Sequence, residues 1–288
     1  MSTMTSGIPL LPRQFGYELL KLFARPRTYI GFGLFLFFEF LLLFLLQLPR
    51  AREAYRELLA NNGYLFAEYF TGPTMAVVII TTSVFFLGSL FLALVAGDIV
   101  AKEVEDGTMR MILNRPVSRV RVLFLKWLAC LVYTFVLLGF IGLTSLLCGV
   151  VSRGWGNLFV YAPLQGVFAV FSPGEGLFRL ALAVVWLSLV MSAVSSIGFF
   201  LSCLSMKPAA ATVLTLAFLF ADFVMNNLPY FAGYAHFFLT HHIGSWALTF
   251  QVYIPWTRLL ESLVWIWAFN LTCFAAGVAI FCNRDFKS

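Results

Sequence analysis

The sequence predicts an all-α membrane protein that crosses the bilayer six times. Of its 288 residues, 61% are hydrophobic and only 11% are charged, and the mean hydropathy is +0.92. Soluble domains carry roughly 25% charged residues, so this chain has too little charge to cover a soluble surface. Six apolar runs also reach the roughly 20 residues that a helix needs to span a bilayer. These observations argue against a secreted disulfide scaffold and against a soluble nucleic-acid-binding module.

The six predicted spans account for nearly half of the chain, and we treat residues 1–288 as one transmembrane domain. The spans cover residues 28–48, 74–97, 127–150, 180–203, 209–228 and 259–282. An even number of spans places both termini on one side, and thirteen of the 19 Lys and Arg residues fall there. The positive-inside rule therefore predicts cytoplasmic termini in a multi-pass protein of the cell (inner) membrane. The same placement explains the net charge of +6, so the predicted partner is the lipid bilayer and not nucleic acid.

Two amphipathic helices are predicted beside the first span. Before it, Gln14, Glu18, Lys21 and Arg25 recur at helical spacing on one face, which predicts a helix in the cytoplasmic interface. After it, Pro49 suits the first turn of a second helix that should lie on the outer side.

Two further apolar segments are predicted to be short re-entrant or interfacial helices on the outer side. Residues 229–258 contain four Gly or Pro residues and the polar run Thr240-His241-His242, so we expect no seventh span there. Residues 158–171 are too short to cross the bilayer, and Pro163 interrupts them, so they receive the same interpretation.

The connection between the second and third spans, residues 98–118, concentrates charge in a short cytoplasmic segment. Asp98 can cap a short helix that Gly107 ends, Thr108 can cap a second one, and the residue before Pro116 should be extended. Ser118 can then cap the third span. The simplest interpretation of such a charged run is a solvated face.

The order of residues in this segment resembles the cytoplasmic region of ABC-2 type transporter permeases. The matching residues are Glu103, Gly107, Thr108, Leu113, Pro116, Ser118 and Arg119, followed by Lys126. The six-span layout and the helix before the first span are similar as well. The resemblance implies that residues 98–118 couple the chain to a separate ATP-hydrolysing subunit. The coupling residues would be Asp98, Lys102, Glu103, Glu105, Asp106, Gly107, Thr108, Arg110, Arg115, Pro116, Ser118 and Arg119.

The resemblance further implies a permease subunit that forms half of an export path. Its partners would be two cytoplasmic ABC ATPase subunits and a second copy of the chain or a homologous permease. None of the five Lys residues follows Gly, so the phosphate-binding P-loop is absent, and ATP and Mg would be held by the partner ATPase. We therefore expect that the chain itself is not an enzyme and holds no cofactor. The alternatives are a non-transporting subunit that passes ATPase-driven motion to external partners and, with less support, an intramembrane lipid-modifying enzyme.

Glu39, Asp222 and Asn226 are the polar residues that could line a substrate path or a gate. An ionised carboxylate facing lipid at mid-membrane costs roughly 3 kcal/mol or more, so Glu39 and Asp222 should face protein or water. The alternative for both carboxyl groups is a structural hydrogen bond between helices. Arg179 and Arg258 are plausible partners of Asp222.

Two weaker patterns have structural explanations. Small residues on one face of the fourth span (Ser188, Ser192, Ser195, Gly198 and Ser202) predict close helix packing, with a dimer seam as one candidate position. The three His residues of the outer segment (His236, His241 and His242) lie beside no Cys, Asp or Glu within residues 229–258, so no metal site is predicted.

Overall fold

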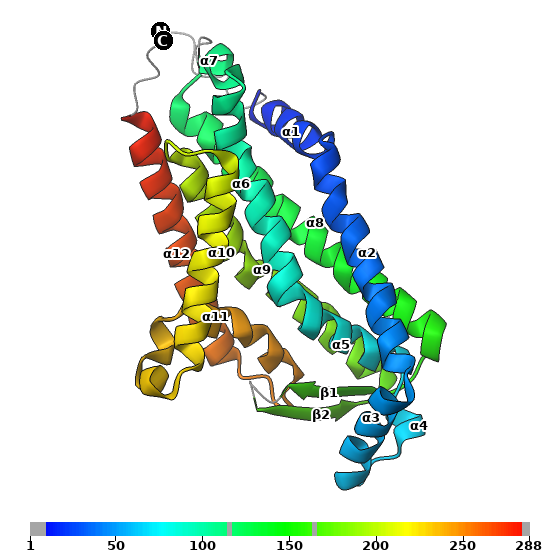
Figure 1. Ribbon diagram of the computed structural model, residues 1–288. Coiled ribbons are helices and arrows are strands. Elements are labelled where there is room, and N and C mark those ends of the chain that lie inside the picture. The colour runs from blue at the N-terminus through cyan, green and yellow to red at the C-terminus, as the bar shows by residue number, and fades with distance from the viewer. Residues whose placement is uncertain (1–9, 114–116, 163–165, 284–288) are drawn as a thin grey trace.

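The computed structural model describes residues 10–113, 117–162 and 166–283 (Figure 1). The first half consists of α1 (Leu10–Phe23), α2 (Pro26–Gln47), α3 (Pro49–Asn61), α4 (Phe66–Tyr69), α5 (Gly72–Ser83), the π-helical turn η1 (Val84–Gly88), α6 (Ser89–Glu105), α7 (Thr108–Leu113) and α8 (Arg119–Arg153). The second half consists of β1 (Leu158–Ala162), β2 (Val167–Phe171), α9 (Pro173–Cys203), α10 (Pro208–Asn227), the 3-10 helices η3 (Pro229–Phe237) and η4 (Gly244–Phe250), α11 (Leu239–Ile243) and α12 (Trp256–Cys282).

The prediction of six membrane-spanning helices is confirmed. Six helical stretches in the described part of the chain are long and apolar enough to cross a membrane: α2, the continuous stretch Gly72–Glu105, α8, α9, α10 and α12. Several helices extend past the predicted ends. The second continues to Glu105 and the third begins at Arg119, because a helix does not stop where its sequence turns polar on leaving the membrane.

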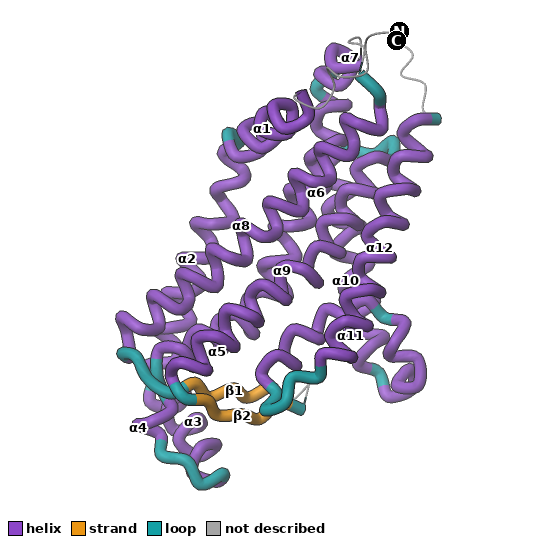
Figure 2. The backbone as a smooth tube through the Cα atoms, turned by 180° about the vertical axis from the view of Figure 1, so that it is seen from behind, coloured by secondary structure: helices purple, strands orange, loops and turns teal. Residues whose placement is uncertain are grey.

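The two ends of the bundle carry different elements (Figure 1, and from behind in Figure 2). One end carries α1, α7, the start of α8 and the end of α12, and we call it the α7 end. The other carries α3, α4, the β-hairpin and the segment from η3 to η4, and we call it the hairpin end. The guanidinium of Arg119 donates to the carbonyl oxygen of Cys282 at 3.1 Å, which joins α8 to α12 at the α7 end.

Helix α9 lies at the centre of the bundle and packs against α6, α8 and α12. Glycines allow the closest approaches. A Cβ added at Gly97 of α6 would lie 2.8 Å from the hydroxyl of Thr212 on α10, and one added at Gly198 of α9 would lie 2.8 Å from the Cβ of Ala96. Close packing through small residues is the usual way in which membrane helices associate.

The small residues predicted on the fourth span lie inside the bundle. The amide of Asn270 on α12 donates to Ser192 at 2.8 Å, and Ser195 is hydrogen-bonded to Thr134 of α8 at 2.7 Å. This face therefore packs within one chain, and its candidate position at a dimer seam is wrong.

The predicted helical interpretation of residues 158–171 is also wrong. Strands β1 and β2 form an antiparallel hairpin, with Leu158 opposite Phe171 and Ala162 opposite Val167. The backbone amide of Phe159 donates to the hydroxyl of Thr74 at 2.9 Å, which attaches the hairpin to α5. Five-residue apolar runs rich in β-branched and aromatic residues suit paired strands better than a helix.

Residues 229–258 form short helices and no seventh span, as predicted. Arg179 of α9 holds this segment in place. Its guanidinium donates to the carbonyl oxygens of Thr249, Gln251 and Val252 at 2.8–3.0 Å and pairs with Glu175 at 3.0 Å. The expected pairing of Arg179 with Asp222 is therefore wrong.

Candidate functional site

The predicted coupling segment is held by an extension of a membrane span. Helix α6 continues to Glu105 and ends before Gly107, whose φ of +72° suits glycine at a helix C-terminus. Helix α7 begins at Thr108, and the hydroxyl of Thr108 donates to the carbonyl oxygen of Glu103 at 3.2 Å. Ser118 caps α8 as predicted, since its hydroxyl accepts from the backbone amide of Arg121 at 3.3 Å.

The capping role predicted for Asp98 is wrong. Asp98 lies inside α6, where it pairs with the guanidinium of Arg27 from α2 at 3.2 Å. The first helical piece of the coupling segment is therefore continuous with the second span.

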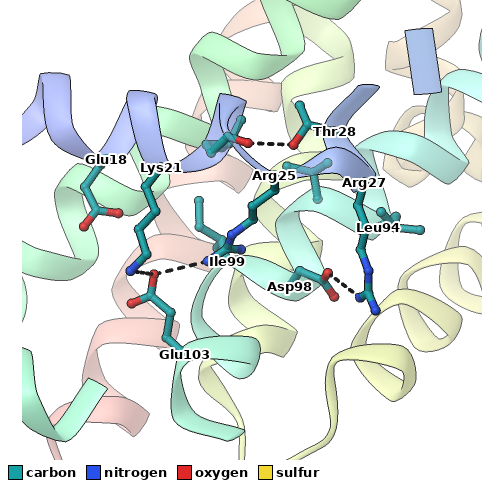
Figure 3. Close-up of a pocket in the computed structure, with 11 residues that line it drawn as sticks. Glu18, Lys21, Arg25, Arg27, Thr28, Leu94, Asp98, Ile99 and Glu103 are labelled. Carbon is teal, nitrogen blue, oxygen red and sulfur yellow. Dashed lines mark hydrogen bonds and ion pairs between the residues drawn. The ribbon is translucent and has the colours of Figure 1, made fainter. Parts of the chain in front are cut away.

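A group of charges with two buried members, Glu103 and Lys126, lies behind this segment. We call it the α7-end charge cluster (Glu18, Lys21, Arg25, Glu103 and Lys126). Oxygen Oε1 of Glu103 lies 2.6 Å from Nζ of Lys21 and 2.7 Å from Nζ of Lys126. Arg25 approaches the same oxygen at 3.5 Å, and Glu18 lies 2.8 Å from Lys126. Figure 3 shows Lys21 and Arg25 from the N-terminal helices converging on Glu103 of α6.

The cluster joins the N-terminal helices to two later helices of the bundle. It links α1 and the start of α2 to α6 and α8, and the side chain of Lys126 is 0% exposed while that of Glu103 is 3% exposed. Removing two charges from water is expensive and is repaid only when the partners stay together. The cluster therefore fixes α1 against both helices that flank the coupling segment.

Glu103 is consequently not presented to a partner, although the resemblance assigned it to the coupling surface. Helix α1 forms as predicted, but its polar residues Glu18 and Lys21 turn toward the protein and leave Tyr17 and Leu20 exposed. Sequence reasoning missed the pairing because Glu18, Glu103 and Lys126 belong to three separate segments. The acidic and basic residues at helical spacing in α1 were the only local signal.

The exposed part of the coupling segment combines charge and apolar surface. Lys102 pairs with Glu105 and with Asp106, both at 3.4 Å, and all three side chains are at least one-third exposed. Met111 of α7 is 65% exposed. An open groove of about 410 Å³ lies between α1, α7 and α8, and its lining includes Tyr17, Met111 and Ile112.

The remaining predicted coupling residues are placed in part. Arg115 and Pro116 lie outside the described residues, so the predicted extended step there stays a prediction. Arg110 belongs to α7. Arg119 contacts the end of α12 as described above, so it fastens the bundle at this end.

Glu39 is fully buried between helices. Its Oε1 accepts from the hydroxyls of Thr144 and Ser145 on α8, both at 2.8 Å. Of the two interpretations left open by the sequence, these contacts favour the structural hydrogen bond between helices.

Asp222 is also buried, and it acts as a cap. Its two carboxylate oxygens accept from the backbone amides of Leu239 and Thr240 at 3.1 and 2.7 Å, at the start of α11. Asn226 lies one turn further along α10 and is partly buried. The contacts of Asp222 share no residue with those of Glu39, so the structure does not bring them together as one site.

The outer histidines are held by structural contacts. One ring nitrogen of His242 lies 2.9 Å from the carbonyl oxygen of His236, the other lies 3.2 Å from the hydroxyl of Ser262, and the ring stacks on Trp265. Burial lowers the pKa of His242 below its usual value. Within the described residues, no three His, Cys, Asp or Glu side chains gather as a metal site.

Comparison with known proteins identifies the family of this bundle. A sequence model of the family described as ABC-2 family transporter protein matches residues 20–261. The Bacillus subtilis (strain 168) protein named Uncharacterized protein YhcI is 30% identical over 113 residues, which are 38% of this chain. That match spans 36% of the relative's length, and no solved structure matches the chain. Because the family match covers most of the 288 residues, the chain belongs to the ABC-2 family of transporter proteins.

Proposed function

We propose that this ABC-2 membrane protein forms half of an export path powered by two separate ATPase subunits. A second copy of the chain or a homologous permease would supply the other half. The observation that carries the proposal is the construction of the α7 end, where an exposed coupling segment is joined to the membrane spans by ion pairs around the buried side chains of Glu103 and Lys126. A segment that only carried solvated charge would not need this support.

The docking surface is formed by α1 and α7, with the groove between them. Exposed Met111 and Tyr17 offer apolar contact, and Glu105 and Asp106 offer charge at the neighbouring end of α6. A small apolar centre within a charged rim is typical of protein interfaces. An ATPase surface that presents a recess for Met111 and basic residues around it would match.

The α7-end charge cluster supports a route from this surface into the membrane. Since α6 is continuous with the second span and Lys126 belongs to the third, a push on α7 moves both spans together with α1. Rigid-body displacement of packed helices is a common form of conformational switching. In this mechanism ATP-driven closure of the ATPases changes the gap between the two permease halves.

The distribution of positive charge supports a cytoplasmic position for the α7 end. Thirteen of the 19 Lys and Arg residues belong to the segments that the sequence assigns to this side, and the positive-inside rule applies to such short connections. This orientation places the docking surface where ATP is available.

The lipid-enzyme alternative receives no support from the two buried carboxyl groups. Glu39 accepts hydrogen bonds from Thr144 and Ser145, and Asp222 caps α11, and these contacts support structural roles for both. The mechanical alternative shares the docking surface with the permease and differs only in what the motion acts on.

Charge reversal on the coupling segment tests the docking surface. In a membrane extract from the native cell, the tagged chain should recover an ATPase, and the double change Glu105→Arg with Asp106→Arg should reduce this recovery by at least tenfold. The control is the double change Glu53→Arg with Glu57→Arg, on the exposed side of α3 at the hairpin end, which should change nothing. Equal loss in both variants, or no loss in the first, would refute the proposed surface.

Transport and mechanical work are separated by a second measurement. Reconstituted vesicles that contain the chain and its ATPase should accumulate an exported compound in an ATP-dependent manner. ATP hydrolysis without any accumulated compound, together with ATP-dependent release of a bound external protein, would favour the mechanical alternative.

A further inference from the structure

A second open cleft lies at the α7 end, on the other side of the Arg27–Asp98 ion pair. It has a volume of about 450 Å³ and is bounded by α2, α6 and the beginning of α10. The close approach of α10 to α6 at Gly97 sets one wall, since Gly97 leaves only enough room for Thr212. Figure 3 shows Arg27 extending from α2 toward Asp98, apart from the residues that converge on Glu103.

The charges that line the cleft are only partly neutralised. Arg27 pairs with Asp98, and Lys102 pairs with Glu105 and with Asp106 beside the cleft, so Lys207 is the lining cation without an ion pair in the described part of the chain. The side chain of Arg27 is 62% exposed and shares a single carboxylate. Lys207 is exposed and makes no ion pair among the described residues.

The arrangement of polar and apolar groups in the cleft follows the layers of a membrane leaflet. Arg27 and Lys207 stand at the first residues of two spans, α2 and α10, where a helix enters the headgroup region. Leu94 and the exposed Val213 line the cleft at greater depth, four residues from Asp98 along α6 and six residues from Lys207 along α10. Cations therefore lie at the depth of lipid phosphates, and apolar side chains lie at the depth of acyl chains.

We infer that this cleft binds the phosphate headgroup of an anionic membrane phospholipid, with an acyl chain along Leu94 and Val213. Arg27 and Lys207 approach the phosphate from opposite walls, and Lys102 closes the site on the side of α7. Basic pockets between membrane helices are known to bind anionic headgroups. The inference depends on the position of the cleft in the membrane and is independent of ATPase docking.

The site is tested on the whole chain in a neutral detergent, with bound lipid counted by native mass spectrometry. Phosphatidylglycerol should bind at least tenfold more tightly than phosphatidylethanolamine. Each Lys or Arg near an anionic lipid changes the affinity by roughly fivefold. The double change Arg27→Gln with Lys207→Gln should therefore weaken the binding of phosphatidylglycerol by about thirtyfold. Lys207→Gln alone should weaken the binding of phosphatidylglycerol by about fivefold, and it disturbs no ion pair among the described residues.

A matched control separates the cleft from general attraction between cations and lipid. Arg258 is exposed near the first residues of α12 at the hairpin end, so it occupies the place of Arg27 on the other side of the membrane. Arg258→Gln should leave phosphatidylglycerol binding unchanged. Arg27→Lys should also bind phosphatidylglycerol as the unchanged chain does, because the positive charge is kept.

Three results would overturn the inference. One is equal binding of phosphatidylethanolamine, and another is unchanged phosphatidylglycerol binding in the Lys207→Gln chain. The third is binding of sn-glycerol 3-phosphate as tight as that of the lipid, which would assign the site to a soluble phosphate compound.

Discussion

Replacing Lys126 by Met removes the central cation of the α7-end charge cluster and should destabilise the protein strongly. The side chain of Lys126 is 0% exposed and lies 2.7 Å from Glu103 and 2.8 Å from Glu18. Loss of one partner from a buried ion pair costs about 3–5 kcal/mol, because a buried charge is left uncompensated. Glu103 keeps Lys21 at 2.6 Å and Arg25 at 3.5 Å, so the lower value, about 3 kcal/mol, is expected.

The assay is thermal unfolding of the detergent-purified chain, followed through the fluorescence of its seven Trp residues. For a chain of this size, about 3 kcal/mol corresponds to a fall in Tm of roughly 6–12 °C. Lys102→Met is the matched control, since Lys102 makes two ion pairs but is one-third exposed, and it should leave the Tm nearly unchanged. A double-mutant cycle of Lys126→Met with Glu103→Gln should show coupling of about 1–3 kcal/mol.

Two outcomes would contradict the buried pairing of Lys126 with Glu103. If Lys126→Met and Lys102→Met lower the Tm equally, the ion pairs of the buried Lys126 stabilise the fold no more than those of the exposed Lys102. If Lys126→Met and Glu103→Gln act additively, the two side chains are not paired in the folded protein.

Three further predictions concern packing, capping and pH. Gly149→Ala should destabilise by about 1–3 kcal/mol in thermal unfolding, because its Cβ would press on the backbone oxygen of Gly72, whereas Gly139→Ala, with open space around it, should not destabilise. Asp222→Ala should cost about 1–2 kcal/mol and increase proteolysis of residues 229–258, because two backbone amides of α11 lose their acceptor; unchanged proteolysis would contradict the capping role. Burial lowers the pKa of His242, so the unfolded chain takes up a proton first. The contribution of His242 to the free energy of unfolding should therefore be fully present above about pH 6.5 and be lost at lower pH. His242→Gln should reduce this pH dependence, and an identical pH profile in the two chains would refute the prediction.

The spans could be predicted from sequence because apolar length alone decides whether a helix crosses a membrane. Their ends could not. Asp98 begins a polar stretch, and a rule based on apolar runs stops there, although the helix continues to Glu105. Only Gly107, with its positive φ, marks the true end locally. The difference matters because it makes residues 98–105 of the coupling segment part of the second span.

The hairpin at residues 158–171 was mistaken for helices because short apolar runs do not reveal their period. The burial of β2 does alternate, but its exposed Phe168 and the exposed Tyr161 of β1 are apolar or aromatic too, so the sequence shows no alternation of apolar and polar residues. Gly166, with φ of +64°, and the β-branched residues around it were the usable signal.

The partners of buried charges could not be predicted from sequence at all. The cost of leaving Glu39 unpaired predicts that it has a partner, and the structure supplies Thr144 and Ser145 from a helix more than 100 residues away. The same holds for Lys126, which donates to Glu103 on the neighbouring helix, 23 residues away, and to Glu18 on the N-terminal helix, 108 residues away. Burial predicts that partners exist, and only the packing of helices decides which they are.

The central claim is that α7 contacts an ATPase, and photo-crosslinking from the side chain at position 111 tests it most directly. A photoreactive residue in place of the exposed Met111 should, in native membranes, become covalently joined to a protein with a P-loop sequence. The same residue in place of Val151, which is 88% exposed near the hairpin end of α8, should give no such product. A P-loop protein captured equally from both positions, or from neither, would contradict the account.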